Sequence, residues 1–122
     1  MGSPKKVLLV DDSITTAKQL EQIISGFSGF QVVGHAKNGA EAVKLYKTLT
    51  PDVVCMDIVM PLMDGLQATR AILQFDQNAK VVMISSLGGV GDKVVEALKV
   101  GAKNVIAKPF EPEKIRSTLE TL

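Results

Sequence analysis

The sequence predicts an α/β fold: a doubly wound, five-stranded parallel sheet with five helices. Short apolar runs alternate five times with longer segments in which apolar residues recur at helical spacing. Several runs are apolar at almost every position, which is typical of parallel strands that helices cover on both faces. No repeat, linker or low-complexity tract interrupts the alternation. We therefore expect helices on both faces of one sheet, joined by right-handed crossovers.

Two strands and two helices are expected in the first half of the chain. Residues 5–10 form the first strand, and Asp12 or Ser13 can cap the helix that follows. The apolar stripe of this helix comprises Ile14, Ala17, Leu20, Ile24 and Phe27. Residues 30–36 form the second strand. The second helix faces inward with Ala42, Val43, Tyr46 and Leu49.

The second half of the chain continues the pattern. The central strand begins at Val53 and ends near Ile58, because Pro61 cannot sit inside a buried strand. The remaining elements are, in order, a helix from near Gly65, a strand over 80–85, a helix with Val94, Ala97 and Leu98 that ends at Gly101, a strand over 104–107, and a helix from about Pro112 with Ile115, Leu119 and Leu122 inward. Residues 86–91 are rich in glycine, and we expect them to be mobile.

Length and composition narrow the class of protein. A chain of 122 residues fits one domain, which we place at 5–122, with 1–4 as an N-terminal extension or cloning remnant. The single cysteine excludes a disulfide framework and suits a reducing compartment, so we expect the cytoplasm. A net charge of +1, with both signs mixed, argues against nucleic acid as a partner. No apolar run approaches the ~20 residues of a membrane span, and no secretory signal is evident.

Asp57 is the most informative single residue. It lies in the apolar run of the central strand, at its carboxyl end, where ligands bind in open α/β sheets. A carboxylate in such surroundings needs a counter-charge or a function. Capping of the next helix is the alternative, but Asp64, directly before Gly65, suits that role better. We therefore assign Asp57 to a functional site.

Four of the five strands end at a polar or charged residue. These residues are Asp11 and Asp12 after the first strand, Asp57, Ser85 and Lys108. The carboxyl ends of parallel strands share one edge, so three carboxylates converge there if the first and third strands are neighbours. An oxygen-only ligand set selects a hard cation such as Mg²⁺. With a lysine that can pair with Asp57 or a bound phosphoryl oxygen, and with a hydroxyl, the set is suited to phosphoryl chemistry.

Each of these residues also has a simpler interpretation. Asp11 or Asp12 can cap the following helix, and a serine at a strand end is often structural. Lys108 can be a solvated surface lysine. Their joint placement on the ends of successive strands is more specific than any one of them.

The motifs at these strand ends resemble a known family. They are Val-Asp-Asp-Ser at 10–13, Met-Asp-Ile-Val-Met-Pro-Leu-Met-Asp-Gly at 56–65, Ile-Ser-Ser at 84–86 and Lys-Pro-Phe at 108–110. In order and spacing the chain resembles the receiver domains of two-component response regulators, of the CheY type, from about Lys5 to its end. The resemblance implies the strand order 2-1-3-4-5.

The resemblance also implies a role for each site residue. Asp57 is the phospho-acceptor, modified to 4-aspartylphosphate, with Ser85 as the switch hydroxyl and Lys108 as the family's lysine. Mg²⁺ is held directly by Asp12 and Asp57, mainly through water by Asp11, and by the backbone carbonyl of Val59. The Lys108–Pro109 bond is expected to be cis.

Partners follow from the same resemblance. The phosphoryl donor is a histidine kinase or a small phosphodonor, and the output is a protein target on the face formed by the fourth helix, fifth strand and fifth helix. We expect a monomer, with dimerisation on activation as an alternative. Two origins stay open: a stand-alone chemotaxis-type regulator, or a receiver cut from a longer response regulator.

Some positions depart from the family pattern. Val105 replaces an aromatic residue that often moves with the switch hydroxyl, so that coupling is in doubt. Val59 and Leu87 stand where the family tunes hydrolysis, and neither can bind an attacking water, so we expect slow loss of phosphate. His35 is expected to take no part in the site, because its strand should not adjoin the acidic cluster.

Three other functions fit the sequence less well. An aspartyl phosphatase or phosphotransferase would place a second Asp two residues after the nucleophile, where Val59 stands. A flavodoxin-like electron carrier would be hindered by Asp11 and Asp12, whose charge repels a flavin phosphate. A receiver-like module that binds without phosphorylation is the closest alternative, and the complete set of site residues argues against it.

Overall fold

The computed structural model describes residues 3–60, 62–85 and 91–122 and contains one parallel sheet of five strands. The strands are β1 (Lys5–Val10), β2 (Phe30–Ala36), β3 (Val53–Asp57), β4 (Val81–Ser85) and β5 (Asn104–Ala107). The helices are α1 (Ile14–Ser25), α2 (Gly39–Leu49), α3 (Gly65–Phe75), α4 (Gly91–Lys99) and α5 (Pro112–Glu120). The spatial order β2-β1-β3-β4-β5 confirms the predicted fold class and strand order.

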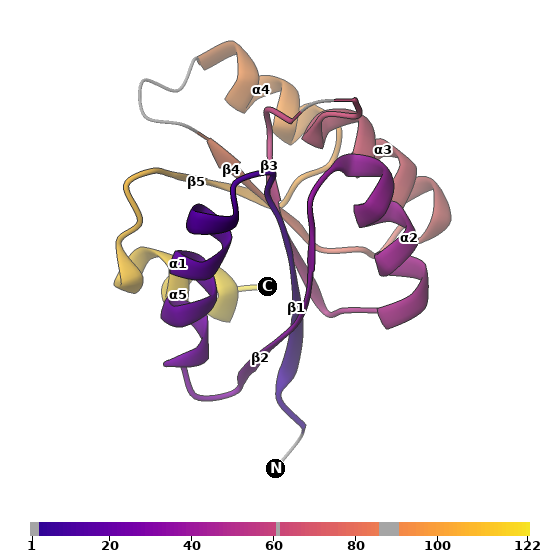
Figure 1. Ribbon diagram of the computed structural model, residues 1–122. Coiled ribbons are helices and arrows are strands. Elements are labelled where there is room, and N and C mark those ends of the chain that lie inside the picture. Colours follow the sequence, from indigo (N-terminus) through magenta and orange to yellow (C-terminus); the bar gives the residue numbers. More distant parts are fainter. Residues whose placement is uncertain (1–2, 61, 86–90) are drawn as a thin grey trace.

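Helices cover both faces of the sheet, as Figure 1 shows: α1 and α5 lie on one face, and α2, α3 and α4 on the other. Alternate residues of β1 separate the two layers of the core. Val7 and Leu9 pack with the residues of α1 and α5, whereas Leu8 and Val10 pack with those of α2 and α3. Every residue of β3 and β4 is buried, which explains why these strands read as continuous apolar runs.

Strand register determines which residues meet at the carboxyl edge. Val10, the last residue of β1, pairs with Met56, so Asp11 and Asp57 follow directly on neighbouring strands. Asp57 pairs in turn with Ile84 of β4. The sheet thus brings the predicted site residues to one edge.

Local signals at the helix ends are confirmed. Ser13 caps α1 by accepting from the Thr16 amide, at 3.3 Å. Asp64 and Gln67 form a capping box at the start of α3, which confirms that Asp64, and not Asp57, is the cap. Gly101, with φ of +113°, follows the end of α4 in a left-handed conformation that favours glycine.

Two apolar residues are more exposed than predicted. Ile14, the first residue of α1, is 54% exposed. Leu98 is 49% exposed, because the adjacent Ala97 is the residue of α4 that faces the core. The predicted mobility of residues 86–91 falls mainly on 86–90, which lie outside the described residues, as does the side chain of Val94. None of the helices in the described part of the chain has the length and apolar character to cross a membrane.

Candidate functional site

Three carboxylates meet at the carboxyl edge of β1 and β3. Asp11 and Asp12 leave the end of β1, and Asp57 is the last residue of β3. One carboxylate oxygen from each residue lies within 4.8 Å of the others. Asp11 and Asp57 are buried, at 5% and 6% exposure, whereas Asp12 is exposed. The predicted convergence of the three acids is therefore confirmed.

The electrostatics of this cluster favour a bound cation. Burial, and next the neighbouring charge of Asp11, raise the pKa of Asp57 from 3.8 to about 6. Lys108 and the backbone amide of Val59 act in the opposite direction, and Asp12 adds to the rise. Since all three side chains offer oxygen ligands, the cluster fits a hard divalent metal ion, which would offset their mutual repulsion.

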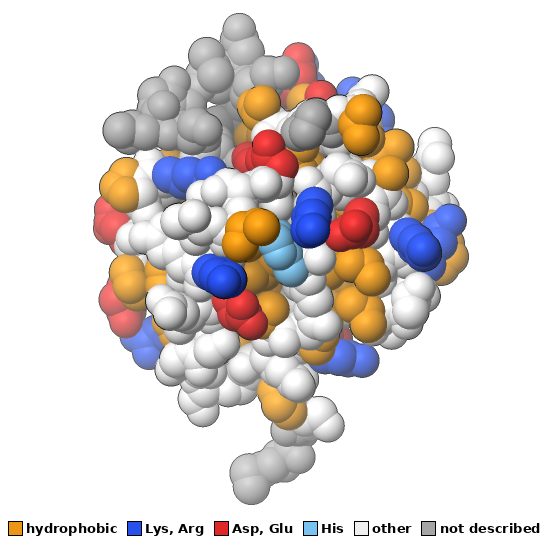
Figure 2. All heavy atoms as spheres, in the orientation of Figure 1, with side chains coloured by type: hydrophobic (Ala, Val, Ile, Leu, Met, Phe, Trp, Pro, Cys, Tyr) orange, Lys and Arg blue, Asp and Glu red, His pale blue; other side chains and the backbone are white. Residues whose placement is uncertain are grey.

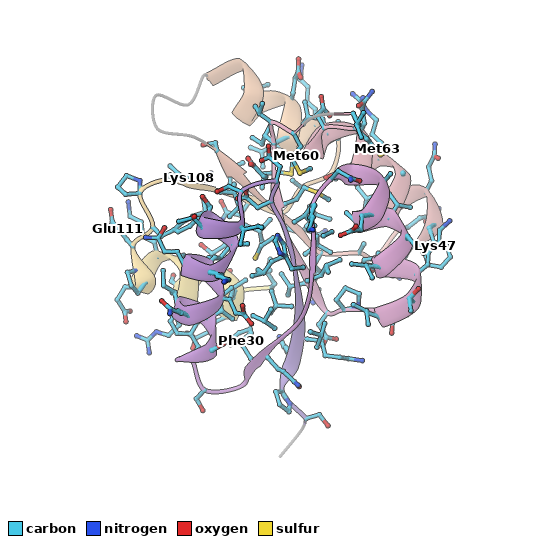
Figure 3. All side chains as sticks on the ribbon, in the orientation of Figure 1. Phe30, Lys47, Met60, Met63, Lys108 and Glu111 are labelled. Atoms are coloured by element: carbon cyan, nitrogen blue, oxygen red, sulfur yellow. The ribbon has the colours of Figure 1, made fainter. Side chains whose placement is uncertain are left out.

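Lys108 approaches the cluster from the end of β5, and Figure 3 shows it at the same end of the sheet as Met60. Its Nζ atom lies 3.8 Å from Asp11 Oδ2. The sequence also offered Asp57 as a partner for Lys108, but among the described residues the ion pair of Lys108 is with Asp11. The predicted cis bond between Lys108 and Pro109 is confirmed.

Ser85 lies at the end of β4 and is buried. It follows Ile84, which pairs with Asp57, and its carbonyl accepts from the Lys108 amide at 3.0 Å. Ser85 is thus fixed between the strand that carries Asp57 and the segment that carries Lys108. Ser85 therefore lies at the carboxyl edge of the sheet, at the end of the strand beside β3.

The loop between β3 and α3 borders the acidic cluster. Val59 is 66% exposed, so its side chain forms an open, apolar rim beside Asp57. The loop closes on the strand itself: the Gly65 amide donates to the Ile58 carbonyl at 2.8 Å. A Cβ atom at Gly65 would lie 2.1 Å from the Asp57 carbonyl oxygen. Only glycine permits so close an approach of α3 to the backbone of Asp57.

His35 also reaches this edge, so the expectation that its strand does not adjoin the acidic cluster is wrong. Its Nε2 atom lies 2.9 Å from the carbonyl oxygen of Asp11. β2 is the neighbour of β1 in the sheet, and His35 pairs with Leu9, two residues before Asp11. The contact could have been predicted from the strand order 2-1-3-4-5, because this order places the end of β2 beside the end of β1.

Comparison with known proteins gives consistent similarities. Residues 7–120 match the family model described as response regulator receiver domain. The chain is 45% identical over 115 residues to chemotaxis protein CheY of Thermotoga maritima, covering 94% of both chains. It is 47% identical over 116 residues to chemotaxis protein CheY of Treponema pallidum, covering 93% of this chain and 79% of that protein. A chain in the crystal structure of the CheX–CheY–BeF3–Mg²⁺ complex from Borrelia burgdorferi matches 98% of this chain and 90% of its own length, with 43% identity and a TM-score of 0.91.

Proposed function

This chain belongs to the response regulator receiver domain family, and on that premise we propose that Asp57 accepts a phosphoryl group from a partner phosphohistidine or a small phosphodonor. The observation that carries the proposal is the buried Asp57 carboxylate within a cluster of three acids and beside Lys108. The relatives named above are chemotaxis proteins, so a chemotaxis-type regulator is the function that we favour.

The transfer requires Asp57 to be ionised and in line with the donor. One Asp57 oxygen attacks phosphorus, an aspartyl phosphate bond forms, and the bond from phosphorus to the donor nitrogen breaks, with the electron pair leaving on the imidazole. Lys108, which already faces the cluster, supplies a positive charge for the phosphoryl oxygens. Ser85 supplies a hydroxyl donor to the same oxygens. These residues make the chain both acceptor and part of its own catalyst.

We assign Mg²⁺ as the cation of this site. Asp12 and Asp57 would hold it directly, Asp11 mainly through water, and the Val59 carbonyl would complete the protein ligands. When bound, the ion supplies neutralisation of the charge that builds up on the transferred group. The oxygen-only cluster supports this assignment, and the solved complex from Borrelia burgdorferi names Mg²⁺ together with BeF3.

Phosphorylation should bias a protein-binding surface. We place the target on the face of α4, β5 and α5, where Lys108 at the end of β5 connects the surface to the site. Val105 lies on β5 in place of an aromatic residue, so we do not assign an aromatic switch to this chain. We further propose that residues 5–122 are the receiver domain and that it works in the cytoplasm as a monomer when unphosphorylated.

The decisive test is intact mass after incubation with phosphoramidate and Mg²⁺. We expect wild-type protein to gain one phosphoryl group, and the Asp57→Asn variant to gain none, because an amide is not a nucleophile for this transfer. Chelation of Mg²⁺ should suppress the gain in wild type.

Asp64→Asn is the matched control for this test. Asp64 lies in the following loop and caps α3, and asparagine preserves that cap. The control should therefore be phosphorylated like wild type. Folded wild-type protein that gains no mass from phosphoramidate or from a phosphorylated kinase would contradict the proposal and favour a module that binds without phosphate.

The exposed Val59 side chain predicts a long-lived phosphoryl group. Because valine cannot hydrogen-bond an attacking water, we expect Val59→Asn to speed hydrolysis roughly fivefold, the effect of one net hydrogen bond of about 1 kcal/mol. The decay of the phosphorylated mass after donor removal measures this rate. Leu62→Asn is the control, since Leu62 is 93% exposed in the same loop and its φ of +70° tolerates asparagine. Equal decay in wild type and Val59→Asn would refute this role. The companion prediction at Leu87 lies outside the described residues.

A further inference from the structure

The backbone amide, the backbone carbonyl and both carboxylate oxygens of Asp11 each have a partner. Its amide donates to the Ala36 carbonyl at 3.0 Å, and its own carbonyl receives His35 Nε2 at 2.9 Å. Its carboxylate accepts from the Ser13 amide through Oδ1, at 2.8 Å, and faces Lys108 through Oδ2. Both backbone groups of Asp11 therefore depend on the end of β2.

Asp12 has no such support of its own. It is exposed, and within the described ranges its carboxylate has neither a hydrogen bond nor an ion pair. Its direction depends on the peptide bond that joins it to Asp11. That bond is planar, so the orientation of the Asp11 carbonyl also sets the orientation of the Asp12 amide. The group that holds this carbonyl is His35.

The chemistry of the contact identifies the donor. A carbonyl oxygen only accepts, so the hydrogen lies on His35 Nε2. The imidazolium and one neutral tautomer both carry that hydrogen, and the contact does not require a charge. His35 is a half-buried residue of β2, and it lines a cavity of about 290 Å³ between α1 and β2. The chain's one histidine is visible at the surface in Figure 2.

The segment of residues 35–39, which includes His35, also contacts the loop between β3 and α3. The Gly39 amide, at the start of α2, donates to the Met63 carbonyl at 3.2 Å. A Cβ atom at Gly39 would lie 2.5 Å from that carbonyl oxygen. Residues 35–39 thus touch both the loop that carries Asp12 and the loop that carries Val59.

We propose that His35 is a positioning residue for the acidic site, which orients Asp12 through its hydrogen bond to the Asp11 carbonyl. This inference rests on the proposed Mg²⁺ site and adds to it a residue on β2. Outer partners of metal ligands commonly change metal affinity by 10–100-fold when they are removed. We expect the lower end of that range, about tenfold, because His35 acts through the backbone.

The experiment compares five proteins: wild type, His35→Phe, His35→Leu, His35→Gln and Gln31→Leu. Phenylalanine keeps an aromatic ring and removes the donor, glutamine restores a donor, and Gln31 is an exposed residue of the same strand. The first readout is amide exchange of Asp11 and Ser13 in the metal-free protein. The second is the dissociation constant of Mg²⁺, from a titration followed by amide chemical shifts. We expect faster exchange and about tenfold weaker Mg²⁺ binding in His35→Phe, recovery in His35→Gln, and no change in Gln31→Leu.

A purely structural role predicts a different result. In that case His35→Phe would lower the unfolding midpoint but leave Mg²⁺ affinity and the Asp11 and Ser13 amides unchanged, and the inference would be overturned. His35→Leu, a second variant without a donor, must agree with His35→Phe, which separates the hydrogen bond from ring size. If wild type neither binds Mg²⁺ nor gains a phosphoryl group, the proposed function fails, and the exchange data still decide whether His35 holds the Asp11 loop.

Discussion

The Gly65→Ala variant is expected to lose about 3 kcal/mol of unfolding free energy and most of its capacity to accept a phosphoryl group. Overpacking in a protein core usually costs about 1–3 kcal/mol, and a contact that cannot relax lies at the upper end of these costs. The added Cβ atom would lie 2.1 Å from the Asp57 carbonyl oxygen and 3.0 Å from its carbonyl carbon. Both atoms belong to the backbone of the central strand, so no side-chain rotation relieves the contact. Either α3 or Asp57 must move, and Asp57 is the proposed phosphoryl acceptor.

Urea denaturation of wild type and Gly65→Ala measures the loss of stability, and mass gain from phosphoramidate measures the loss of function. Gly26→Ala is the matched control at the end of α1. Its Cβ atom would meet the Ile23 carbonyl oxygen at 3.4 Å, an ordinary contact distance. We expect it to behave like wild type in both assays. If Gly65→Ala unfolds at the same urea concentration as wild type, then α3 does not pack on Asp57 as closely as described.

Asp57→Asn is expected to stabilise the metal-free protein by about 3 kcal/mol at pH 8 and by about 1 kcal/mol near pH 4.5, given a folded-state pKa of about 6 against an ordinary 3.8. The raised pKa means that the folded state releases the proton less readily than the unfolded state. The folded state is therefore penalised increasingly as pH rises from about 4 to about 6, and the full penalty persists above that window. Asparagine carries no such proton, so the variant escapes the penalty.

Urea denaturation with a chelator present, at both pH values, tests this expectation. Asp64→Asn is again the control, because its carboxylate lies outside the cluster and its cap survives. Addition of Mg²⁺ at pH 8 should stabilise wild type more than Asp57→Asn, since the ion compensates the charge that the variant lacks. Equal stability of wild type and Asp57→Asn at pH 8 without metal would show that burial and the neighbouring charges do not raise the pKa of Asp57 in this way.

The architecture followed from local patterns. Runs such as residues 53–58 are apolar throughout because both faces of the strand are covered, and Pro61 shows where that strand ends. Asp57 therefore had to lie at the carboxyl edge. Its convergence with Asp11 and Asp12 needed one further fact, the adjacency of β1 and β3, which the family resemblance supplied and the register confirms.

Other features depended on contacts between distant segments. Lys108 faces Asp11, and His35 binds the Asp11 carbonyl. Both contacts depend on the strand order and on the register of β5 and β2 in the sheet, which set where these strands end relative to β1. The close packing of Gly65 on Asp57 involves only backbone atoms. The pattern of apolar residues in the sequence does not report backbone contacts, so it could not predict this one. The sequence by itself thus determined the helices and strands, the edge of the sheet that carries the site, and the place of Asp57 at that edge, because periodicity and chain breaks are local. The tertiary structure decided which side chain or carbonyl each site residue meets, because register and backbone approach are set only when the sheet is assembled.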